Sequence, residues 1–210
     1  SMKVVSPSPH RHLDAMAARL RDRLAKVSVG DPAVEGVKMG ALASKAQQAD
    51  VAARVAQLAA FNEIVIGPSE GFRPLGEGTD GGAFFAPTLV LCRDGASNDA
   101  VHDVEAFGPV STLMPYGDFD EALALAKRGR GSLVATLVTH DPKVAAKAIP
   151  QMAAWHGRLL VLDRDAAGES TGHGSPLPML KHGGPGRAGG GEELGGLRAV
   201  KHFLQRAAVQ

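Results

Sequence analysis

The sequence predicts an α/β protein in which a parallel-rich sheet is flanked by helices. Short apolar runs of strand length alternate with amphipathic stretches of helix length, most regularly between residues 110 and 162. This alternation is typical of βαβ units. In addition, 44% of the 210 residues are hydrophobic and 21% are charged, which is typical of a chain that folds around a core.

Two rules assign the individual elements. Apolar residues that recur at i, i+3 and i+4 predict a helix, and a short apolar run bounded by glycine or proline predicts a strand. Caps such as Ser44 and turns such as Gly30-Asp31-Pro32 mark the ends of elements. In chain order the predicted elements are helix 12–27, helix 44–61, strand 64–66, extended segment 84–92, strand 110–114, helix 118–127, strand 133–139, helix 141–155, strand 159–162, helix 197–204 and terminal strand 205–210.

The composition excludes several classes of partner. The formal net charge is +1, which argues against nucleic acid or an anionic membrane as the main partner. No apolar run approaches the roughly 20 residues of a membrane helix. The single cysteine excludes an intrachain disulfide and fits a reducing cytoplasm, which is the predicted location.

Taken residue by residue, the sequence offers no complete catalytic or metal centre. Cys92 ends an apolar run, and such a cysteine is more often a buried small hydrophobic residue than a nucleophile. The eight histidines lack the spacing of metal ligands, so no metal site is predicted. His173, between two glycines, is the histidine that a ligand could approach most closely.

The glycine-rich and acidic segments also have structural explanations. The run 189–191 does not follow a strand and is followed by two acids, which disfavours phosphate binding and favours a flexible turn. Asp118, Asp120 and Glu121 are explained by helix capping and the helix dipole. The long segment 165–196, rich in Gly, Pro, His and Ser, has no pattern of its own and is interpreted as a functional loop.

One short run, Glu105-Ala106-Phe107-Gly108-Pro109-Val110, resembles the Glu-x-Phe-Gly-Pro-Val signature of the aldehyde dehydrogenase superfamily. Other segments resemble that family in the right order. They are the helix from His12 to the Val29-Gly30-Asp31-Pro32 turn, Phe85-Ala86-Pro87-Thr88-Leu89, the helix start Asp120-Glu121-Ala122, and Leu133-Val134-Ala135. The chain is therefore similar to the carboxy-terminal part of the family's catalytic domain.

The last part of the sequence resembles one branch of the family. Residues 172–178, 181–187 and 190–196 are similar to the enzymes that handle CoA-linked semialdehydes in aerobic phenylacetate and benzoate catabolism. The resemblance implies oxidation of such an aldehyde to the acid, with NAD or NADP as the coenzyme. The two coenzymes are not distinguished by this part of the chain.

The resemblance also implies roles for particular residues. Glu105 would accept hydrogen bonds from the nicotinamide-ribose hydroxyls, and Phe107 would press on the nicotinamide. Leu133 would line the junction of coenzyme and substrate. The loop residues His173, Gly174 and Ser175 would shape the aldehyde tunnel. Without the family motifs, Glu105 would be interpreted as a solvated loop acid and Phe107 as a core residue.

The sequence departs from the family pattern at its amino-terminal end. The nucleophilic cysteine would precede the helix at His12, where residues 4–9 contain no cysteine, so no catalytic residue is predicted. Residues 1–11 are interpreted as a tag remnant and an artificial boundary, 12–204 as a partial catalytic domain, and 205–210 as a strand for subunit contact in a homodimeric parent enzyme.

Two interpretations of function follow from this departure. In the first, the chain is a fragment that needs the remainder of the dehydrogenase polypeptide to oxidise a small-molecule aldehyde, and it binds no coenzyme tightly alone. In the second, it is a natural truncated homologue that acts as a non-catalytic binding or assembly module.

Overall fold

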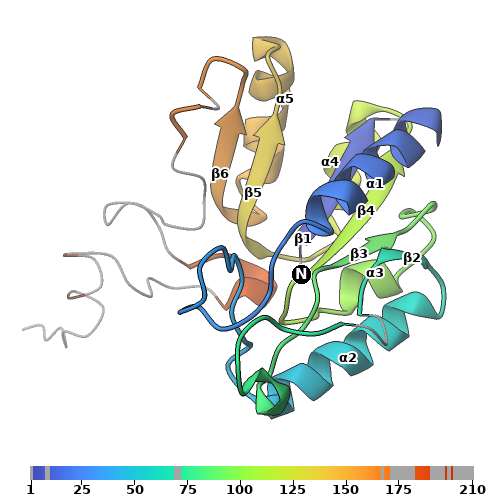
Figure 1. Ribbon diagram of the computed structural model, residues 1–210. Coiled ribbons are helices and arrows are strands. Elements are labelled where there is room, and N and C mark those ends of the chain that lie inside the picture. The colour runs from blue at the N-terminus through green and yellow to red at the C-terminus, as the bar shows by residue number, and fades with distance from the viewer. Residues whose placement is uncertain are drawn as a thin grey trace, which may run out of the picture. The chain divides into compact units, whose positions relative to one another are not determined.

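A computed structural model of the chain describes residues 2–7, 10–68, 72–166, 168–170, 183–189, 197 and 200. The chain divides into two compact units, residues 1–122 and 123–210. The first unit contains a four-stranded sheet and the second a two-stranded sheet, each accompanied by helices (Figure 1). The predicted α/β class with parallel-rich sheets is therefore confirmed.

The sheet of the first unit has the strand order β1-β4-β3-β2. Its strands are β1 (Met2–Pro7), β4 (Val110–Tyr116), β3 (Thr88–Leu91) and β2 (Glu63–Ile66). The first three are parallel to one another, whereas β2 pairs with β3 in the antiparallel direction. Sequence analysis did not predict β1, because it interpreted residues 1–11 as a tag remnant and an artificial boundary, whereas residues 2–7 pair with β4.

One face of this sheet is covered by α1 (His10–Leu24). Leu13 is fully buried in a cluster with leucines of the two central strands, and Ala17 lies in the same cluster. The strand residues of the cluster are Leu89, Leu91 and Leu113. Each fully buried leucine contributes about 2 kcal/mol. Of the apolar residues whose spacing predicts this helix, Leu13, Leu20 and Leu24 pack on the sheet, whereas Met16 is 38% exposed.

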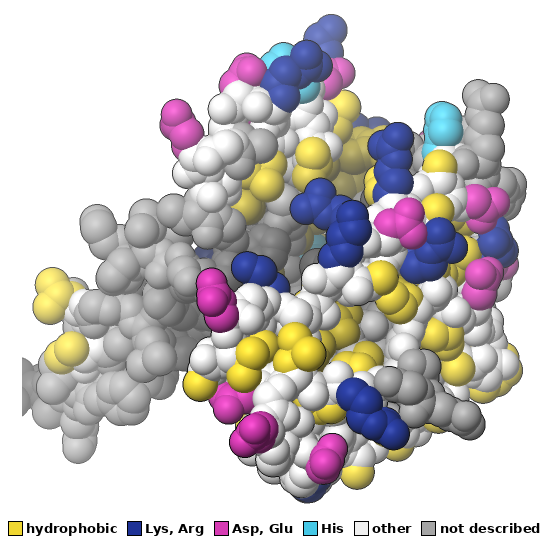
Figure 2. Space-filling view, viewed as in Figure 1, with side chains coloured by type: hydrophobic (Ala, Val, Ile, Leu, Met, Phe, Trp, Pro, Cys, Tyr) yellow, Lys and Arg dark blue, Asp and Glu magenta, His cyan; other side chains and the backbone are white. Residues whose placement is uncertain are grey.

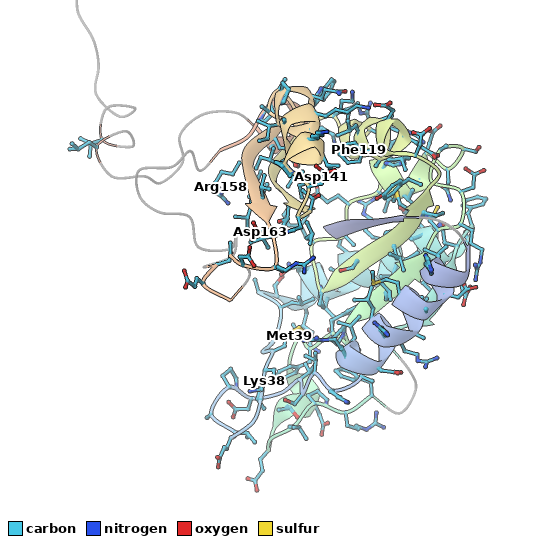
Figure 3. All side chains as sticks on the ribbon, turned by 90° about the horizontal axis from the view of Figure 1, so that it is seen from above. Lys38, Met39, Phe119, Asp141, Arg158 and Asp163 are labelled. Atoms are coloured by element: carbon cyan, nitrogen blue, oxygen red, sulfur yellow. The ribbon has the colours of Figure 1, made fainter. Side chains whose placement is uncertain are left out.

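The turn after α1 is held by backbone hydrogen bonds. The N–H of Gly30 donates to the carbonyl of Met39, at 3.0 Å, and the N–H of Lys38 donates to the carbonyl of Ser28, at 2.9 Å. Lys38 and Met39 are labelled in Figure 3. The chain then enters α2 (Lys45–Ala59), whose N-cap is Ser44 as predicted: the Ser44 side chain accepts a hydrogen bond from the Gln47 N–H. The short helix α3 (Ala100–Asp103) was not predicted.

Two acidic residues cap α4 (Phe119–Lys127). The Asp118 carboxylate accepts a hydrogen bond from the Glu121 N–H at 2.9 Å. The Glu121 carboxylate in turn accepts one from the Gly117 N–H at 2.6 Å. Asp118 thus acts as the N-cap, and Glu121 holds the residue before it. The prediction that Asp118 and Glu121 cap the helix is confirmed.

The second unit contains a βαβ arrangement. Strands β5 (Ser132–Val138) and β6 (His156–Leu162) are parallel and are joined by α5 (Pro142–Met152). Asp141 caps α5 and Pro142 occupies its first turn, where a missing N–H costs nothing (Figure 3). The helix ends before the predicted Trp155. Pro150 lies inside its last turn and cannot donate a hydrogen bond there.

A glycine-rich turn packs against the beginnings of β5 and β6. It contains the short 3-10 helix η2 (Gly186–Ala188), and Arg187 donates its N–H to the Arg130 carbonyl at 3.1 Å. A methyl group on Gly157 would overlap the Gly183 carbonyl oxygen. The backbones therefore meet directly, without side chains between them.

His156 is a buried titratable group in this unit. Its Nδ1 lies 2.5 Å from the Ser132 hydroxyl, and its Nε2 has no hydrogen-bond partner within the described part of the chain. Burial lowers the pKa of His156 below its ordinary value of 6.5, because desolvation disfavours the imidazolium ion.

The free energy of unfolding is expected to fall as the pH drops below about 6.5, because the unfolded chain then binds a proton at His156 that the folded chain does not. The expected slope from this group approaches 1.4 kcal/mol per pH unit between its unfolded and folded pKa values. Urea unfolding over that pH range should show a shallower slope for His156→Gln. Equal slopes for His156→Gln and the wild type would contradict the prediction.

Candidate functional site

The family-like motif forms a tight turn between α3 and β4. The N–H of Gly108 donates to the Ala106 carbonyl at 2.9 Å, and that of Val110 donates to the Gly108 carbonyl at 2.7 Å. The Pro109 carbonyl accepts a hydrogen bond from the Thr88 N–H at 2.8 Å. Residues 105–110, called the motif turn below, are thus joined to the beginning of β3 and lead directly into β4.

The residues of the motif turn differ in exposure. Ala106 is fully buried, whereas Phe107 is 66% exposed and Glu105 is exposed as well. An aromatic ring this exposed is not a core residue, so that interpretation of Phe107 is wrong. An exposed apolar ring and an acceptor-only carboxylate two residues apart are a combination that suits a ligand with an aromatic ring and hydroxyl groups.

The first turn of α2 holds the motif turn and a neighbouring loop by their carbonyl groups. The Gln47 side-chain amide donates to the Phe107 carbonyl, at 2.6 Å. Gln48 donates to the Phe84 carbonyl, at 2.6 Å, and the Lys45 ammonium donates to the Gly82 carbonyl, at 2.5 Å. Sequence analysis did not identify these residues. The available signal was the Ser44-x-x-Gln47 spacing of a capping box.

Gly108 lets the motif turn lie directly on α2. A Cβ atom at Gly108 would lie 2.8 Å and 2.9 Å from the two methyl carbons of Val51. Val51 is fully buried, and its branched side chain has little freedom to move away. The glycine of the motif is therefore required by packing.

The other predicted site residues lie elsewhere in the chain. Leu133 is on β5 in the second unit and is 43% exposed. His173, Gly174 and Ser175 lie outside the described residues, as does the predicted strand 205–210. Their predicted roles stay predictions.

Cys92 follows β3 and is 1% exposed. Its N–H donates to the Leu113 carbonyl at 2.9 Å. The interpretation of Cys92 as a buried small hydrophobic residue is confirmed.

Three ligand-type side chains gather on the loops that follow β5 and β6. Atoms of His140, Asp163 and Asp165 lie within 4.8 Å of one another (Asp163 is labelled in Figure 3). Asp163 already accepts hydrogen bonds from the N–H groups of Asp165 and Ala166, at 3.0 Å and 2.7 Å. These backbone bonds lower the pKa of Asp163. The same bonds form an Asx turn, which accounts for the position of the Asp163 carboxylate. We assign no ion to the cluster.

The molecular surface carries charges of both signs. Figure 2 shows lysine, arginine and acidic side chains on the same face, in agreement with the formal net charge of +1. None of the helices in the described ranges is both long enough and apolar enough to cross a membrane.

The fold is that of the aldehyde dehydrogenases. A crystal structure of betaine aldehyde dehydrogenase from Staphylococcus aureus matches 97% of this chain with a TM-score of 0.77, at 22% sequence identity, and the match spans 37% of that protein. Aldehyde dehydrogenase C from Pseudomonas syringae, solved with NAD+ and octanal, matches 96% with a TM-score of 0.74, at 25% identity.

The sequence shows the same relationship. The aldehyde dehydrogenase family model matches residues 9–209, and this chain belongs to that family. The protein MaoC of Klebsiella aerogenes is 53% identical over 173 residues, which is 82% of this chain and 50% of MaoC. The 3,4-dehydroadipyl-CoA semialdehyde dehydrogenase of Aromatoleum evansii is 42% identical over 171 residues, 81% of this chain and 33% of that enzyme. The chain thus spans half or less of the length of these two relatives.

Proposed function

We propose that this chain supplies part of the catalytic domain of an NAD(P)-dependent aldehyde dehydrogenase that oxidises a CoA-linked semialdehyde from aromatic-compound degradation. The exposed pair of Glu105 and Phe107 on the motif turn carries the proposal. The substrate class is supported by the 42% identity to an enzyme named for such a semialdehyde.

The residues of the motif turn fit a nicotinamide riboside. Phe107 offers an exposed apolar face for the ring. Glu105 offers carboxylate oxygens that accept hydrogen bonds from ribose hydroxyls. The backbone carbonyls of Ala106 and Phe107 accept hydrogen bonds from the Gly108 N–H and the Gln47 side chain, which fixes the backbone that carries the Phe107 ring. Glu105 and Phe107 would hold the nicotinamide riboside of a coenzyme that would supply the hydride acceptor for the oxidation, with water as the source of the second oxygen of the acid.

The remaining proposed roles concern the substrate and the partner. Leu133 offers an exposed apolar side chain on β5, which suits the junction of coenzyme and aldehyde. His173, Gly174 and Ser175 would shape the aldehyde tunnel. The remainder of the dehydrogenase polypeptide would provide the nucleophile and the coenzyme domain, and the parent enzyme would be a cytoplasmic homodimer through 205–210.

The second candidate is a non-catalytic binding or assembly module. The observation that favours it is the burial of Cys92, the only cysteine of the chain, at 1% exposure. Thiolate chemistry requires an accessible sulfur and a neighbour that lowers its pKa. For the isolated chain we therefore expect no aldehyde oxidation and no tight coenzyme binding.

One assay tests the proposal. The 210-residue chain is compared with the same chain joined to the proposed remainder of the dehydrogenase polypeptide, called the full-length protein below. Each is supplied with NAD+ or NADP+ and a CoA-linked semialdehyde, with octanal for comparison. Formation of reduced coenzyme is followed by absorbance. We expect turnover by the full-length protein, none by the chain alone, and unchanged turnover in full-length Cys92→Ser.

Two outcomes would count against it. Reduced coenzyme formed by the chain alone and lost on Cys92→Ser would make Cys92 the nucleophile. A full-length protein that oxidises no aldehyde with either coenzyme would favour the binding or assembly module.

A further inference from the structure

We propose that Gln47 is a positioning residue for the coenzyme, because its side chain ties the motif turn to the amino-terminal turn of α2. The inference rests on the proposed function of Glu105 and Phe107. Gln47 itself is not assigned a contact with the coenzyme. Its role is to fix the backbone from which those two side chains project.

Both ends of the Gln47 amide have a defined partner. The amide nitrogen donates to the Phe107 carbonyl oxygen at 2.6 Å. The amide oxygen accepts a hydrogen bond from the Ala43 N–H at 2.9 Å. A carbonyl can only accept and an N–H can only donate, so the partners determine a single orientation of the amide. Gln47 thus bridges the start of α2 and the motif turn.

This bridge matters because Phe107 has little side-chain packing to hold it. Its ring is 66% exposed, so its position depends on the backbone of the motif turn. A contact residue must be held to within about 0.5 Å to favour the productive arrangement of a bound group. The hydrogen bond to the Phe107 carbonyl acts at the residue whose ring is proposed to contact the nicotinamide.

The positioning role can be separated from a role in helix stability. Gln47 is the third residue after the N-cap Ser44, where glutamate caps a helix well and interacts favourably with its dipole. Gln47→Glu keeps an acceptor for Ala43, but it removes the donor and places a carboxylate oxygen against the Phe107 carbonyl oxygen. A purely structural role predicts that Gln47→Glu is harmless, whereas the positioning role predicts that it disturbs the motif turn.

The first measurement uses the 210-residue chain and needs no coenzyme. Amide hydrogen exchange of the peptide spanning 105–110 should be about tenfold faster in Gln47→Glu and in Gln47→Met, as expected for loss of one hydrogen bond. Thermal unfolding of Gln47→Glu should remain at the wild-type temperature. The matched control Gln57→Glu makes the same charge change at an exposed position of α2 and should leave the exchange unchanged.

The second measurement uses the full-length enzyme. Both Gln47 variants should raise KM for the coenzyme about tenfold, with KM for the aldehyde unchanged, and Gln57→Glu should behave as the wild type. Unchanged amide exchange in residues 105–110 would overturn the inference. A raised KM in Gln47→Glu but not in Gln47→Met would also overturn it, because that result indicates charge repulsion and not the loss of the hydrogen bond. A wild-type enzyme that reduces no coenzyme would overturn the proposed function, while faster exchange in the Gln47 variants would still show that Gln47 holds the motif turn.

Discussion

Replacing Gly108 with alanine is expected to lower the free energy of unfolding by about 2 kcal/mol. The added methyl group would lie within 3 Å of both methyl carbons of Val51, and Val51 is fully buried in α2. A branched side chain cannot rotate out of the way, so the motif turn must move away from the helix. Urea unfolding of the 210-residue chain measures the loss.

A double variant tests whether the contact with Val51 causes the loss of stability in Gly108→Ala. Val51→Ala removes the two methyl groups, so the double variant should lose about 1 kcal/mol less than the sum of the single losses. Gly81→Ala is the matched control, because no heavy atom lies within 4 Å of its added carbon, and its stability should be unchanged. Additive losses in the double variant would show that the cost of Gly108→Ala comes from elsewhere.

A larger loss, about 3 kcal/mol, is expected for Gly157→Ala. The new methyl group would overlap the backbone carbonyl oxygen of Gly183, and a backbone group can yield only if the whole turn moves. The turn 183–189 should therefore separate from the beginnings of β5 and β6. Hydrogen exchange should show faster exchange at the Arg187 amide, which donates to the Arg130 carbonyl.

Gly168→Ala provides the comparison for this prediction, since open space surrounds that position. It should leave both the unfolding transition and the exchange at Arg187 unchanged. If Gly157→Ala is as stable as Gly168→Ala and keeps the Arg187 amide protected, the close backbone contact is not a determinant of stability.

Local patterns in the sequence were sufficient to predict most of the fold. The leucine spacing of α1, the cap at Ser44 and the apolar runs of β3 and β4 each carry their own signal, because helix and strand periodicity depend on neighbouring residues. Strand β1 could not be predicted in this way. This strand forms by pairing with β4, which is distant in the sequence; Met2, for example, pairs with Ser111.

The candidate site was predictable only in part for a similar reason. Family resemblance identified Glu105 and Phe107, and the exposure of both is a property of the fold that composition does not reveal. The hydrogen bond from Gln47 joins residues 60 positions apart. Nothing in the sequence near Gln47 indicates which carbonyl its amide will bond. From the sequence alone, a role in capping α2 would be sufficient to explain a glutamine at this position.

The hydrogen bonds made by the first turn of α2 have a consequence for the order of folding. Gln48 and Gln47 bond to carbonyls that lie 36 and 60 residues further along the chain. Contacts of this separation form slowly, because long loops must close before they contribute. The motif turn can therefore reach its final shape only after α2 has docked against it.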